Sequence, residues 1–277
     1  MLYYILYQQF FSWYYISLAM NNHFVFPYAG NKRQEVVKLH DYIVDKLDGI
    51  DTIIENFCGS SAMSYYISTK YPKRFKYILN DMNPRLIELY CLVINKEKFD
   101  SFLIELNELV KLITSKDEYN KIVKPDTFIA WFVANLIHAI RPKLYKPNYV
   151  PKTYVFNDRG IIHFLQNEDV EIRSIDGCEL FKQYENDSNV LLLVDPPYVL
   201  SDNSLYSHTT SDIYEYCGGN TLNTFSAFVI FVLEENWITR MLFKDNIKLS
   251  YPKKYESNGG VAGGIKKKTT HIIISNR

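Results

Sequence analysis

The sequence lacks the cysteine and histidine spacing of a disulfide framework or a metal site. Its four cysteines, Cys58, Cys91, Cys178 and Cys217, are far apart, form no Cys-x-x-Cys pair and have no histidine cluster near them. Reduced thiols of the kind found in cytosolic proteins are therefore expected, rather than disulfides or bound zinc.

The chain also lacks an excess of charge of either sign. Its 31 basic side chains balance 31 acidic ones, so the formal net charge is zero. The molecule as a whole therefore has no field that draws it to a polyanion. Any contact with nucleic acid must use a local basic patch, or a partner subunit must supply the charge.

A long uninterrupted apolar run is missing too. Residues 1–19 are rich in apolar and aromatic side chains, but Gln8 and Gln9 divide them. The segment has neither the basic start nor the cleavage site of a secretion signal, and its apolar runs are short for a membrane span. We expect residues 1–19 to be an extension ahead of a domain that starts near Met20, without stable membrane association. A peripheral membrane anchor is the alternative.

Strand-like and helix-like patterns alternate along the rest of the chain. Apolar runs predict strands near residues 52–55, 77–79, 170–173, 190–194, 226–233 and 270–275. Helical spacing of apolar residues lies between the first runs, as in residues 34–47, and continues without strand signals through residues 97–141. The pattern predicts a doubly wound α/β sheet with an inserted helical block.

The most informative motif is Asp195-Pro196-Pro197-Tyr198, which directly follows the five aliphatic residues 190–194. Such a run is typical of a buried parallel strand, and open α/β sheets bind ligands at the carboxyl ends of their strands. The two prolines stiffen the turn and leave its carbonyl groups as acceptors beside an aromatic ring. This arrangement suits a flat substrate with an exocyclic amine, such as adenine. A strand that simply ends in a stiff turn is the alternative.

A second group of residues suits a ligand that contains a nucleoside. Residues 55–61 read as a strand end, a turn of small residues around Gly59 and a helix start, which lets a ligand approach the backbone closely. Asp81 follows the next strand, where α/β proteins bind ribose hydroxyls. Capping of the helix that begins at Pro84 is an equal alternative for Asp81. No triphosphate-binding lysine follows the glycine turn, so a nucleoside triphosphate is not expected.

Four short motifs, in their order along the chain, resemble those of one enzyme family. They are Phe-Pro-Tyr-Ala-Gly-Asn-Lys-Arg at residues 26–33, Glu-Asn-Phe-Cys-Gly-Ser at 55–60, Asn-Asp-Met-Asn at 80–83 and Asp-Pro-Pro-Tyr at 195–198. Together they are similar to the alpha group of S-adenosylmethionine-dependent DNA adenine-N6 methyltransferases, the Dam-like family. The end of the chain, with Ser-Asn-Gly-Gly at residues 257–260, also resembles the end of that fold.

The resemblance implies a Rossmann-like methyltransferase fold with a mixed sheet and an inserted helical target-recognition region. Residues 20–94 and 170–277 would form the catalytic domain, and residues 95–169 the inserted region. S-adenosylmethionine would be the methyl donor, and no metal is implied.

The resemblance also implies roles for residues on the donor side of the site. Tyr28 and Lys32 would line the methyl-donor site, and Glu55 would hold the amino group of the donor's methionine part. Gly59 would allow the donor to approach the backbone, and Asp81 would bind its ribose hydroxyls.

The remaining motif positions imply contacts to adenine rings. Asp176, before Gly177, would contact the adenine of the donor, although an aspartate in a surface turn is an equal alternative. Asp195 would contact the donor and, with the carbonyl of Pro196, accept the two N–H bonds of the target amine. Tyr198 would stack on a target adenine rotated out of the duplex.

Some residues depart from the family pattern. Ser61 stands where a second glycine is usual, Asn56 where proline is common, and His271 where the last strand often carries glutamate. Residues 95–170 do not clearly match the family's DNA-reading hairpin.

A basic segment with interleaved aromatic residues suits phosphate contacts and base stacking. We assign nucleic-acid binding to its basic side chains Arg141, Lys143, Lys146 and Lys152. A solvated loop is the alternative, and the lysines at residues 266–268 are a second candidate patch.

We therefore expect a site-specific DNA adenine-N6 methyltransferase that acts on double-stranded DNA in the cytoplasm. It would act alone or with a partner subunit or restriction endonuclease of a restriction-modification system. Methylation of RNA is an alternative, because the Asp195–Tyr198 motif does not distinguish the sugars. A catalytically silent nucleic-acid-binding subunit is the other alternative, because the recognition region matches poorly.

Overall fold

One seven-stranded sheet forms the centre of the molecule, in a computed structural model that describes residues 32, 35–134, 159–200, 211–254 and 268–277. The strand order is β3-β2-β1-β4-β5-β7-β6. The strands are β1 (Thr52–Asn56), β2 (Lys76–Asn80), β3 (Asp169–Arg173), β4 (Val190–Val194), β5 (Phe228–Glu234), β6 (Ile247–Lys254) and β7 (Lys268–Ser275). The first five are parallel, whereas β7 is antiparallel to both β5 and β6. This mixed sheet is that of a Rossmann-like methyltransferase, which confirms the predicted fold class.

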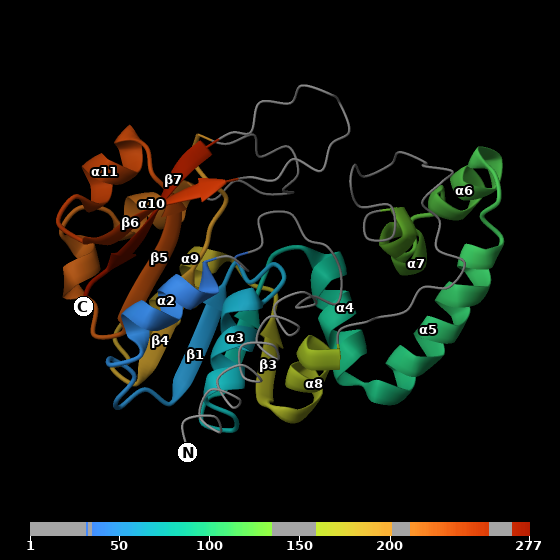
Figure 1. Ribbon diagram of the computed structural model, residues 1–277, viewed down its shortest axis with the longest axis horizontal. Coiled ribbons are helices and arrows are strands. Elements are labelled where there is room, and N and C mark those ends of the chain that lie inside the picture. The colour runs from blue at the N-terminus through green and yellow to red at the C-terminus, as the bar shows by residue number, and fades with distance from the viewer. Residues whose placement is uncertain (1–31, 33–34, 135–158, 201–210, 255–267) are drawn as a thin grey trace, which may run out of the picture.

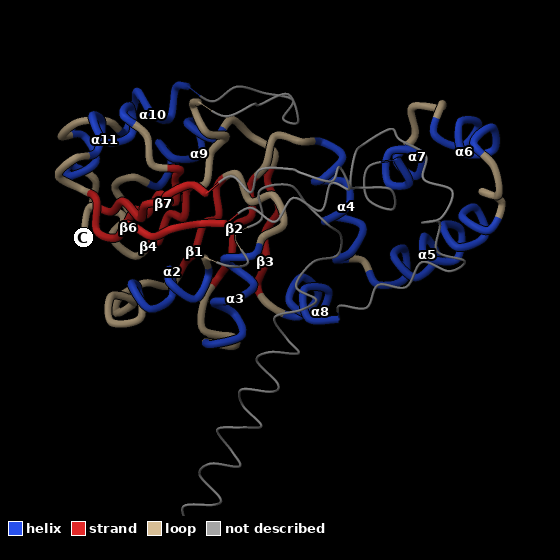
Figure 2. Tube along the Cα trace, turned by 45° about the horizontal axis from the view of Figure 1, so that its top comes forward, coloured by secondary structure: helices blue, strands red, loops and turns tan. Residues whose placement is uncertain are grey.

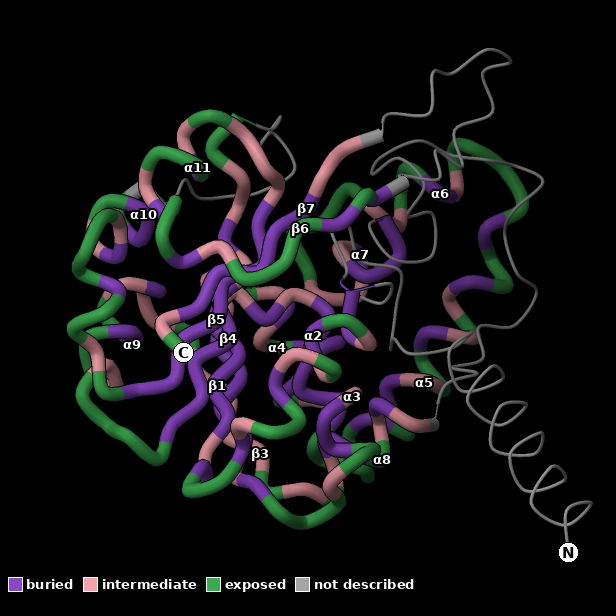
Figure 3. Tube along the Cα trace, turned by 60° about the vertical axis from the view of Figure 1, so that its left-hand side comes forward, coloured by how far each residue is buried: buried purple, intermediate pink, exposed green. Residues whose placement is uncertain are grey.

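The sheet is apolar on both faces, and its buried residues alternate between two cores. In β1 and β2, Ile53 and Tyr77 belong to one core, whereas their neighbours Ile54 and Ile78 belong to the other. This two-residue period follows from strand geometry, in which successive side chains point to opposite faces. The central strands are accordingly buried along their length (Figure 3).

Helices cover both faces of the sheet. α2 (Val36–Ile43), α3 (Ala62–Lys70) and α8 (Arg159–Asn167) lie on one face, and α9 (Gly177–Tyr184), α10 (Ser211–Cys217) and α11 (Trp237–Phe243) on the other (Figure 2). A short 3-10 helix (Thr221–Thr224) precedes β5. The helix predicted over residues 34–47 ends as a helix at Ile43, although Leu47 is buried in the same core.

The inserted segment forms a helical arm, as its apolar spacing predicted. α4 (Pro84–Ile94) leads into α5 (Lys96–Lys111), α6 (Lys116–Val123) and α7 (Phe128–Phe132), which extend away from the sheet (Figure 1). Polar side chains cap each start: Asn83, Asn95, Ser115 and Thr127 all accept a hydrogen bond from a backbone N–H of the first turn. Pro84 occupies the first turn of α4, where its missing N–H costs nothing.

The arm and the sheet share one apolar core. Phe99 and Phe102 of α5 belong to the same buried cluster as Phe164 of α8, which packs on the sheet side of α4. The division into a catalytic domain and an inserted region with limits near residues 95 and 169 therefore stays a prediction.

The sequence pattern missed one strand. Among the described strands, β6 lies at the edge of the sheet and pairs with β7 alone, across positions that include Pro252 and Lys253. Proline and lysine are tolerated at an edge, where one side of the strand needs no ladder hydrogen bonds. The segment therefore lacks the apolar run that revealed the other strands.

No helix in the described ranges combines the length and apolarity that crossing a bilayer requires. Residues 1–19, to which we assigned an extension, lie outside those ranges.

Candidate active site

Asp195 lies at the point where the order of the strands reverses. It directly follows β4, whose neighbours are β1 on one side and β5 on the other, and its N–H donates a 3.4 Å hydrogen bond to the carbonyl of Asn56 at the end of β1. The chain leaves β1 and β4 at the same edge of the sheet. Crevices outside the carboxyl ends of strands at such a switch point are where open α/β sheets bind ligands.

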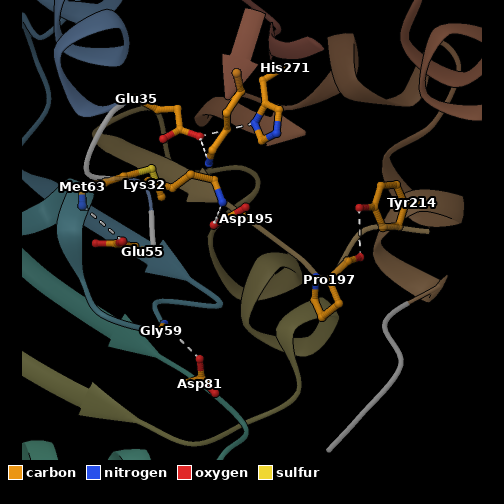
Figure 4. Close-up of polar contacts among 11 residues, drawn as sticks. Lys32, Glu35, Glu55, Gly59, Met63, Asp81, Asp195, Pro197, Tyr214 and His271 are labelled. Atoms are coloured by element: carbon orange, nitrogen blue, oxygen red, sulfur yellow. Dashed lines mark hydrogen bonds and ion pairs between the residues drawn. The ribbon is translucent and has the colours of Figure 1, made fainter. Parts of the chain in front are cut away.

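Lys32 of the N-terminal motif reaches the same place. Its ammonium group forms an ion pair with Oδ2 of Asp195 (Figure 4), and the two side chains are 5% and 15% exposed. Burial raises the pKa of the Asp195 carboxyl, and the charge of Lys32 and its hydrogen bond oppose that rise. Lys32 therefore helps to keep the carboxyl of Asp195 ionised in a largely dry site.

The turn after Asp195 is held by contacts to the carbonyl of Pro197 and to the ring of Tyr198. The Tyr214 hydroxyl donates a 3.1 Å hydrogen bond to the carbonyl of Pro197 (Figure 4). The ring of Tyr198 has the ammonium of Lys32 5.3 Å from its centroid and meets the ring of His271 edge to face, at 5.5 Å and 80°. The predicted residues Lys32, Asp195 and Tyr198 are thus brought together.

Three further residues, which no sequence motif assigned to the site, lie beside this group. Glu35, Lys253 and His271 come from the start of α2, from β6 and from β7, and all are buried. Lys253 forms an ion pair with Oε1 of Glu35, and Nδ1 of His271 lies 3.4 Å from the same oxygen. The one sequence signal that could have pointed to this cluster is His271, a polar residue within the predicted last strand. Lys253 lies in β6, which the sequence pattern did not reveal.

Glu55 is a buried carboxyl at the end of β1. It accepts hydrogen bonds from the N–H groups of Ser64, at 2.8 Å, and Met63, at 3.4 Å, in the first turn of α3. Burial raises the pKa of Glu55 to about 7, and the hydrogen bonds from Ser64 and Met63 oppose that rise. No basic side chain in the described part of the chain pairs with it. A cationic group of a ligand would therefore find a carboxylate partner here.

The turn after β1 has an unusual backbone. Phe57, Gly59 and Ser61 all have positive φ, at 62°, 47° and 54°. This left-handed region is easy for glycine but costly for other residues, and such strain is concentrated at functional sites. Tyr90 of α4 braces the turn: its hydroxyl donates to the carbonyl of Gly59 and accepts a 3.1 Å hydrogen bond from the hydroxyl of Ser61. Ser61 therefore adopts a left-handed conformation that would suit the glycine expected at this position from the family pattern.

Asp81 is joined to this turn. Its Oδ2 accepts a 3.0 Å hydrogen bond from the N–H of Gly59, and its Oδ1 accepts a 2.9 Å bond from the N–H of Asn83. The alternative in which Asp81 caps the helix at Pro84 is wrong, because the side chain of Asn83 caps α4. Asp81 instead ties the end of β2 to the glycine turn. A contact from Asp81 to a ribose stays a prediction.

Asp176 lies in the loop after β3 rather than at the end of that strand, which stops at Arg173. Its carboxylate caps α9 by accepting hydrogen bonds from the N–H groups of Cys178 and Glu179. The loop itself is held by two buried amides, because Asn56 donates to the carbonyl of Gly177 at 2.7 Å and Asn80 bonds both backbone groups of Ile175 at 3.0 Å. A contact from Asp176 to the donor's adenine stays a prediction.

Several predicted residues fall outside the described part of the chain. These are Tyr28, the basic residues Arg141, Lys143, Lys146 and Lys152, and the lysines at residues 266 and 267. Among the described residues, no three His, Cys, Asp or Glu side chains are grouped as the ligands of a metal ion.

The mixed sheet, its strand order and the carboxylates at the ends of β1, β2 and β4 define a Rossmann-like methyltransferase. Residues 28–157 match the model of a protein family described as D12 class N6 adenine-specific DNA methyltransferase. This match covers somewhat less than half of the chain and is consistent with a Dam-like DNA adenine-N6 methyltransferase, as the motifs indicated. A search of curated proteins found no match. The matched segment holds the motifs around Lys32, Glu55 and Asp81, and the parallel pairing of β4 with β1 brings Asp195 to them from outside it.

Proposed function

We propose that this protein transfers the methyl group of S-adenosylmethionine to N6 of an adenine in double-stranded DNA. The observation that carries the proposal is the buried Asp195 carboxylate, paired with Lys32 at the switch point of the sheet and next to the ring of Tyr198. The family match supports DNA adenine as the substrate. We also propose that the protein is intracellular, because its DNA substrate is there.

The residues on the donor side fit S-adenosylmethionine. Glu55 offers a buried carboxylate for the donor's amino group. The strained turn at Gly59 lets the donor approach the protein backbone closely. Asp81 has its carboxylate at the same turn, where it suits the ribose hydroxyls. When bound, S-adenosylmethionine would supply an electrophilic methyl group on a positively charged sulfur.

Asp195 would act on the target amine. The lone pair of adenine N6 is delocalised into the ring, which makes the amine a weak nucleophile. Asp195 and the carbonyl of Pro196 would accept its two N–H bonds and favour a tetrahedral nitrogen with a localised lone pair. The hydrogen bond to the charged carboxylate would strengthen as positive charge develops on the nitrogen.

Lys32 and Tyr198 would prepare the site for the amine. Lys32 would keep Asp195 ionised before the amine arrives, because burial alone would favour the neutral acid. Tyr198 would stack on an adenine rotated out of the duplex, and contacts of this kind contribute about 1–3 kcal/mol per base. Holding the amine in line with the methyl group would supply much of the rate enhancement by proximity.

The charge of the described arm bears on how DNA is held. Residues 96–134 contain six basic side chains (Lys96, Lys98, Lys111, Lys116, Lys121 and Lys124) and seven acidic ones (Glu97, Asp100, Glu105, Glu108, Asp117, Glu118 and Asp126). An arm with this balance gains little from phosphate contacts. We therefore assign phosphate binding to the basic residues of 141–152 or to a partner, such as a subunit or endonuclease of a restriction-modification system.

The test is mass spectrometry of N6-methyladenine after incubation of the protein with S-adenosylmethionine and unmethylated duplex DNA. The parent protein should form N6-methyladenine, Asp195→Ala should form none, and Asp195→Asn should be nearly as impaired because it loses the charge. Asp245→Ala, which changes an exposed carboxylate after α11, is the control and should match the parent. Equal turnover by Asp195→Ala and the parent would contradict the assignment of the site. A parallel incubation with RNA of the same sequence shows which of the two polymers is the substrate, because N6-methyladenine should form in the DNA and not in the RNA.

A further inference from the structure

A buried polar cluster lies beside the Asp195 motif and has no part in the proposed chemistry. Its members are Glu35, Lys253 and His271, whose side chains are 3%, 9% and 0% exposed. Burying charged groups is costly even when they are paired, and a well-packed apolar set is often as stable. A cluster of this kind next to the active site therefore calls for a role beyond stability.

The cluster favours one state of the His271 ring. Oε1 of Glu35 accepts the ion pair from Lys253 and also lies 3.4 Å from Nδ1 of His271 (Figure 4). Burial, followed by the charges of Lys253 and Lys32, lowers the pKa of His271 to about 3, so the imidazole is neutral at physiological pH. The 3.4 Å contact between Nδ1 and the carboxylate does not meet hydrogen-bond geometry, so it acts electrostatically and favours the tautomer with the proton on Nδ1. The carboxylate thereby disfavours the other tautomer, and burial of the ring on β7 limits its motion.

The fixed imidazole contacts the ring that we expect to receive the target base. His271 and Tyr198 meet edge to face, with centroids 5.5 Å apart. Lys32, which pairs with Asp195, lies 5.3 Å from the centroid of the same tyrosine ring. A continuous set of contacts therefore runs from Lys253 through Glu35 and His271 to Tyr198.

We propose that His271 and Glu35 are positioning residues that set the orientation of the Tyr198 ring for stacking on the target adenine. His271 acts through Tyr198, and Glu35 acts by holding His271. Lys253 neutralises Glu35 and ties the hairpin of β6 and β7 to the start of α2. The proposal rests on the function proposed above, because it concerns the base rather than the methyl donor.

A purely structural role makes different predictions. If the cluster only anchored the start of α2 to the sheet, its loss would lower stability and weaken donor and DNA binding alike. A positioning role concerns one ring, so its loss should affect the target base and leave the donor site unchanged. Changes at His271 should then also matter less once Tyr198 itself is removed.

The kinetic test uses His271→Phe, which keeps a ring but cannot contact Glu35 through a nitrogen. We expect its apparent KM for unmethylated duplex DNA to rise a few-fold and by less than about tenfold, the value of a whole aromatic pair contact, because Phe keeps the ring but loses the contact that orients it. The dissociation constant of S-adenosylmethionine, measured by calorimetry, should match that of the parent. In a Tyr198→Ala background, His271→Phe should raise the KM by less than about twofold. Thr270→Ala, on the opposite face of β7, is the matched control and should leave the KM unchanged.

Two further variants guard against simple unfolding. His271→Gln keeps a polar group that can face Glu35 and should restore part of the loss. The pair Glu35→Gln with Lys253→Met removes both charges together, so that no buried charge is left without a partner. This double variant should fold and should reproduce the KM effect of His271→Phe.

A spectroscopic test does not depend on activity. The chain has six histidines, so ring-labelled ¹⁵N histidine gives few signals, and His271→Phe identifies the one from His271. This signal should show a neutral ring protonated on Nδ1 down to about pH 5, below the ordinary histidine pKa. Tyr198→Ala should shift this signal. The double variant Glu35→Gln with Lys253→Met should broaden the signal or change the tautomer that it reports.

The outcomes separate the two proposals. Two results with an active parent would overturn the positioning role alone. Either His271→Phe leaves the KM unchanged, or its effect on the KM is as large in the Tyr198→Ala background as in the parent. A His271 signal that titrates near its ordinary pKa would overturn it as well. A parent that methylates no adenine would overturn the proposed function, and this role with it, even where the His271 contacts appear in the spectrum.

Discussion

The backbone N–H of Gly59 donates a 3.0 Å hydrogen bond to Oδ2 of Asp81, which joins the turn after β1 to the end of β2. The two groups were assigned to different parts of the donor from the sequence. Their contact means that the carboxylate expected to bind ribose also holds the turn in its left-handed conformation. If this is the donor site, as we propose, the turn is organised before the donor binds, which lowers the entropy lost on binding.

Asp81→Ala should weaken donor binding and loosen this turn. Both backbone donors, on Gly59 and Asn83, lose their acceptor, which should destabilise the fold by about 1–2 kcal/mol because water can partly replace it. The affinity for S-adenosylhomocysteine, measured by calorimetry, should fall about tenfold or more, the value of one lost charge-assisted contact. Asp100→Ala, on the arm, is the control. Lower stability with unchanged affinity would leave Asp81 only a structural role.

Replacing Ser61 tests the strain in the same turn. Ser61→Gly removes the cost of the left-handed conformation, about 1–2 kcal/mol, which stabilises the fold. It also loses the hydrogen bond to Tyr90, of about 1 kcal/mol, and raises the entropy of the unfolded chain, and both of these destabilise the fold. The stability of Ser61→Gly in urea should therefore stay close to that of the parent. Ser61→Ala keeps the strain but loses the hydrogen bond, and should be about 1 kcal/mol less stable. The reverse order of the two variants would contradict this account of the turn.

Donor affinity should depend on pH through Glu55. Its carboxyl has a pKa of about 7, raised by burial, and only the ionised form attracts the donor's amino group. Affinity for S-adenosylhomocysteine should therefore rise about tenfold between about pH 6 and pH 8, as the ionised fraction increases. Glu55→Gln should bind weakly, with little dependence on pH over that range.

The same ionisation has the opposite effect on stability without ligand. A carboxyl whose pKa rises on folding from 4.5 to about 7 favours the folded protein below 4.5, and this contribution is lost as the pH increases through 7. Relative to Glu55→Gln, the parent should thus lose stability from about pH 4.5 to about pH 7, and the upper part of this range overlaps the range in which it gains donor affinity. Parallel pH profiles of stability and affinity would contradict the role of Glu55.

Lys32 should determine the acidic limb of the rate profile. Burial raises the pKa of Asp195 and Lys32 opposes that rise, so Lys32→Met should raise the pKa further. Because only the ionised Asp195 activates the amine, the rise of kcat with pH should move to higher pH, and Lys32→Arg should move it part of the way back. Lys98→Met, on the exposed face of α5, is the control. A profile of Lys32→Met that coincides with the parent's would mean that Lys32 does not control this ionisation.

The sequence was sufficient for most of the sheet, because strand signals are local. Five aliphatic residues before Asp195 predict β4 wherever the rest of the chain goes, and Asn83 with Pro84 predicts the start of α4. The edge strand β6 was missed because half of its environment is solvent. Its alternation is also interrupted by a shift in register between Ile247 and Leu249.

The site was predictable only where a motif carries the chemistry within a few residues. Glu35 and Lys253 are 218 residues apart, and their pairing depends on the position of β7 between β5 and β6. The use of Asn56 where proline is common was likewise uninformative alone. Its partner Asn80 is 24 residues away, and together these amides hold the loop at Gly177.

Binding of DNA should depend on salt through the basic segment beyond α7. Neutralising Arg141, Lys143, Lys146 and Lys152 together should flatten the slope of log affinity against log salt by up to about 3–4 units on duplex DNA, because each lost phosphate contact removes about 0.9. The matched control neutralises four exposed lysines of the arm, Lys96, Lys98, Lys121 and Lys124, and should change the slope little because acidic residues outnumber basic ones there. Both variants should bind S-adenosylhomocysteine as the parent does, because the residues assigned to the donor site are untouched. Equal slopes for the parent and the first variant would place the phosphate contacts elsewhere, on the lysines at residues 266–268 or on a partner subunit.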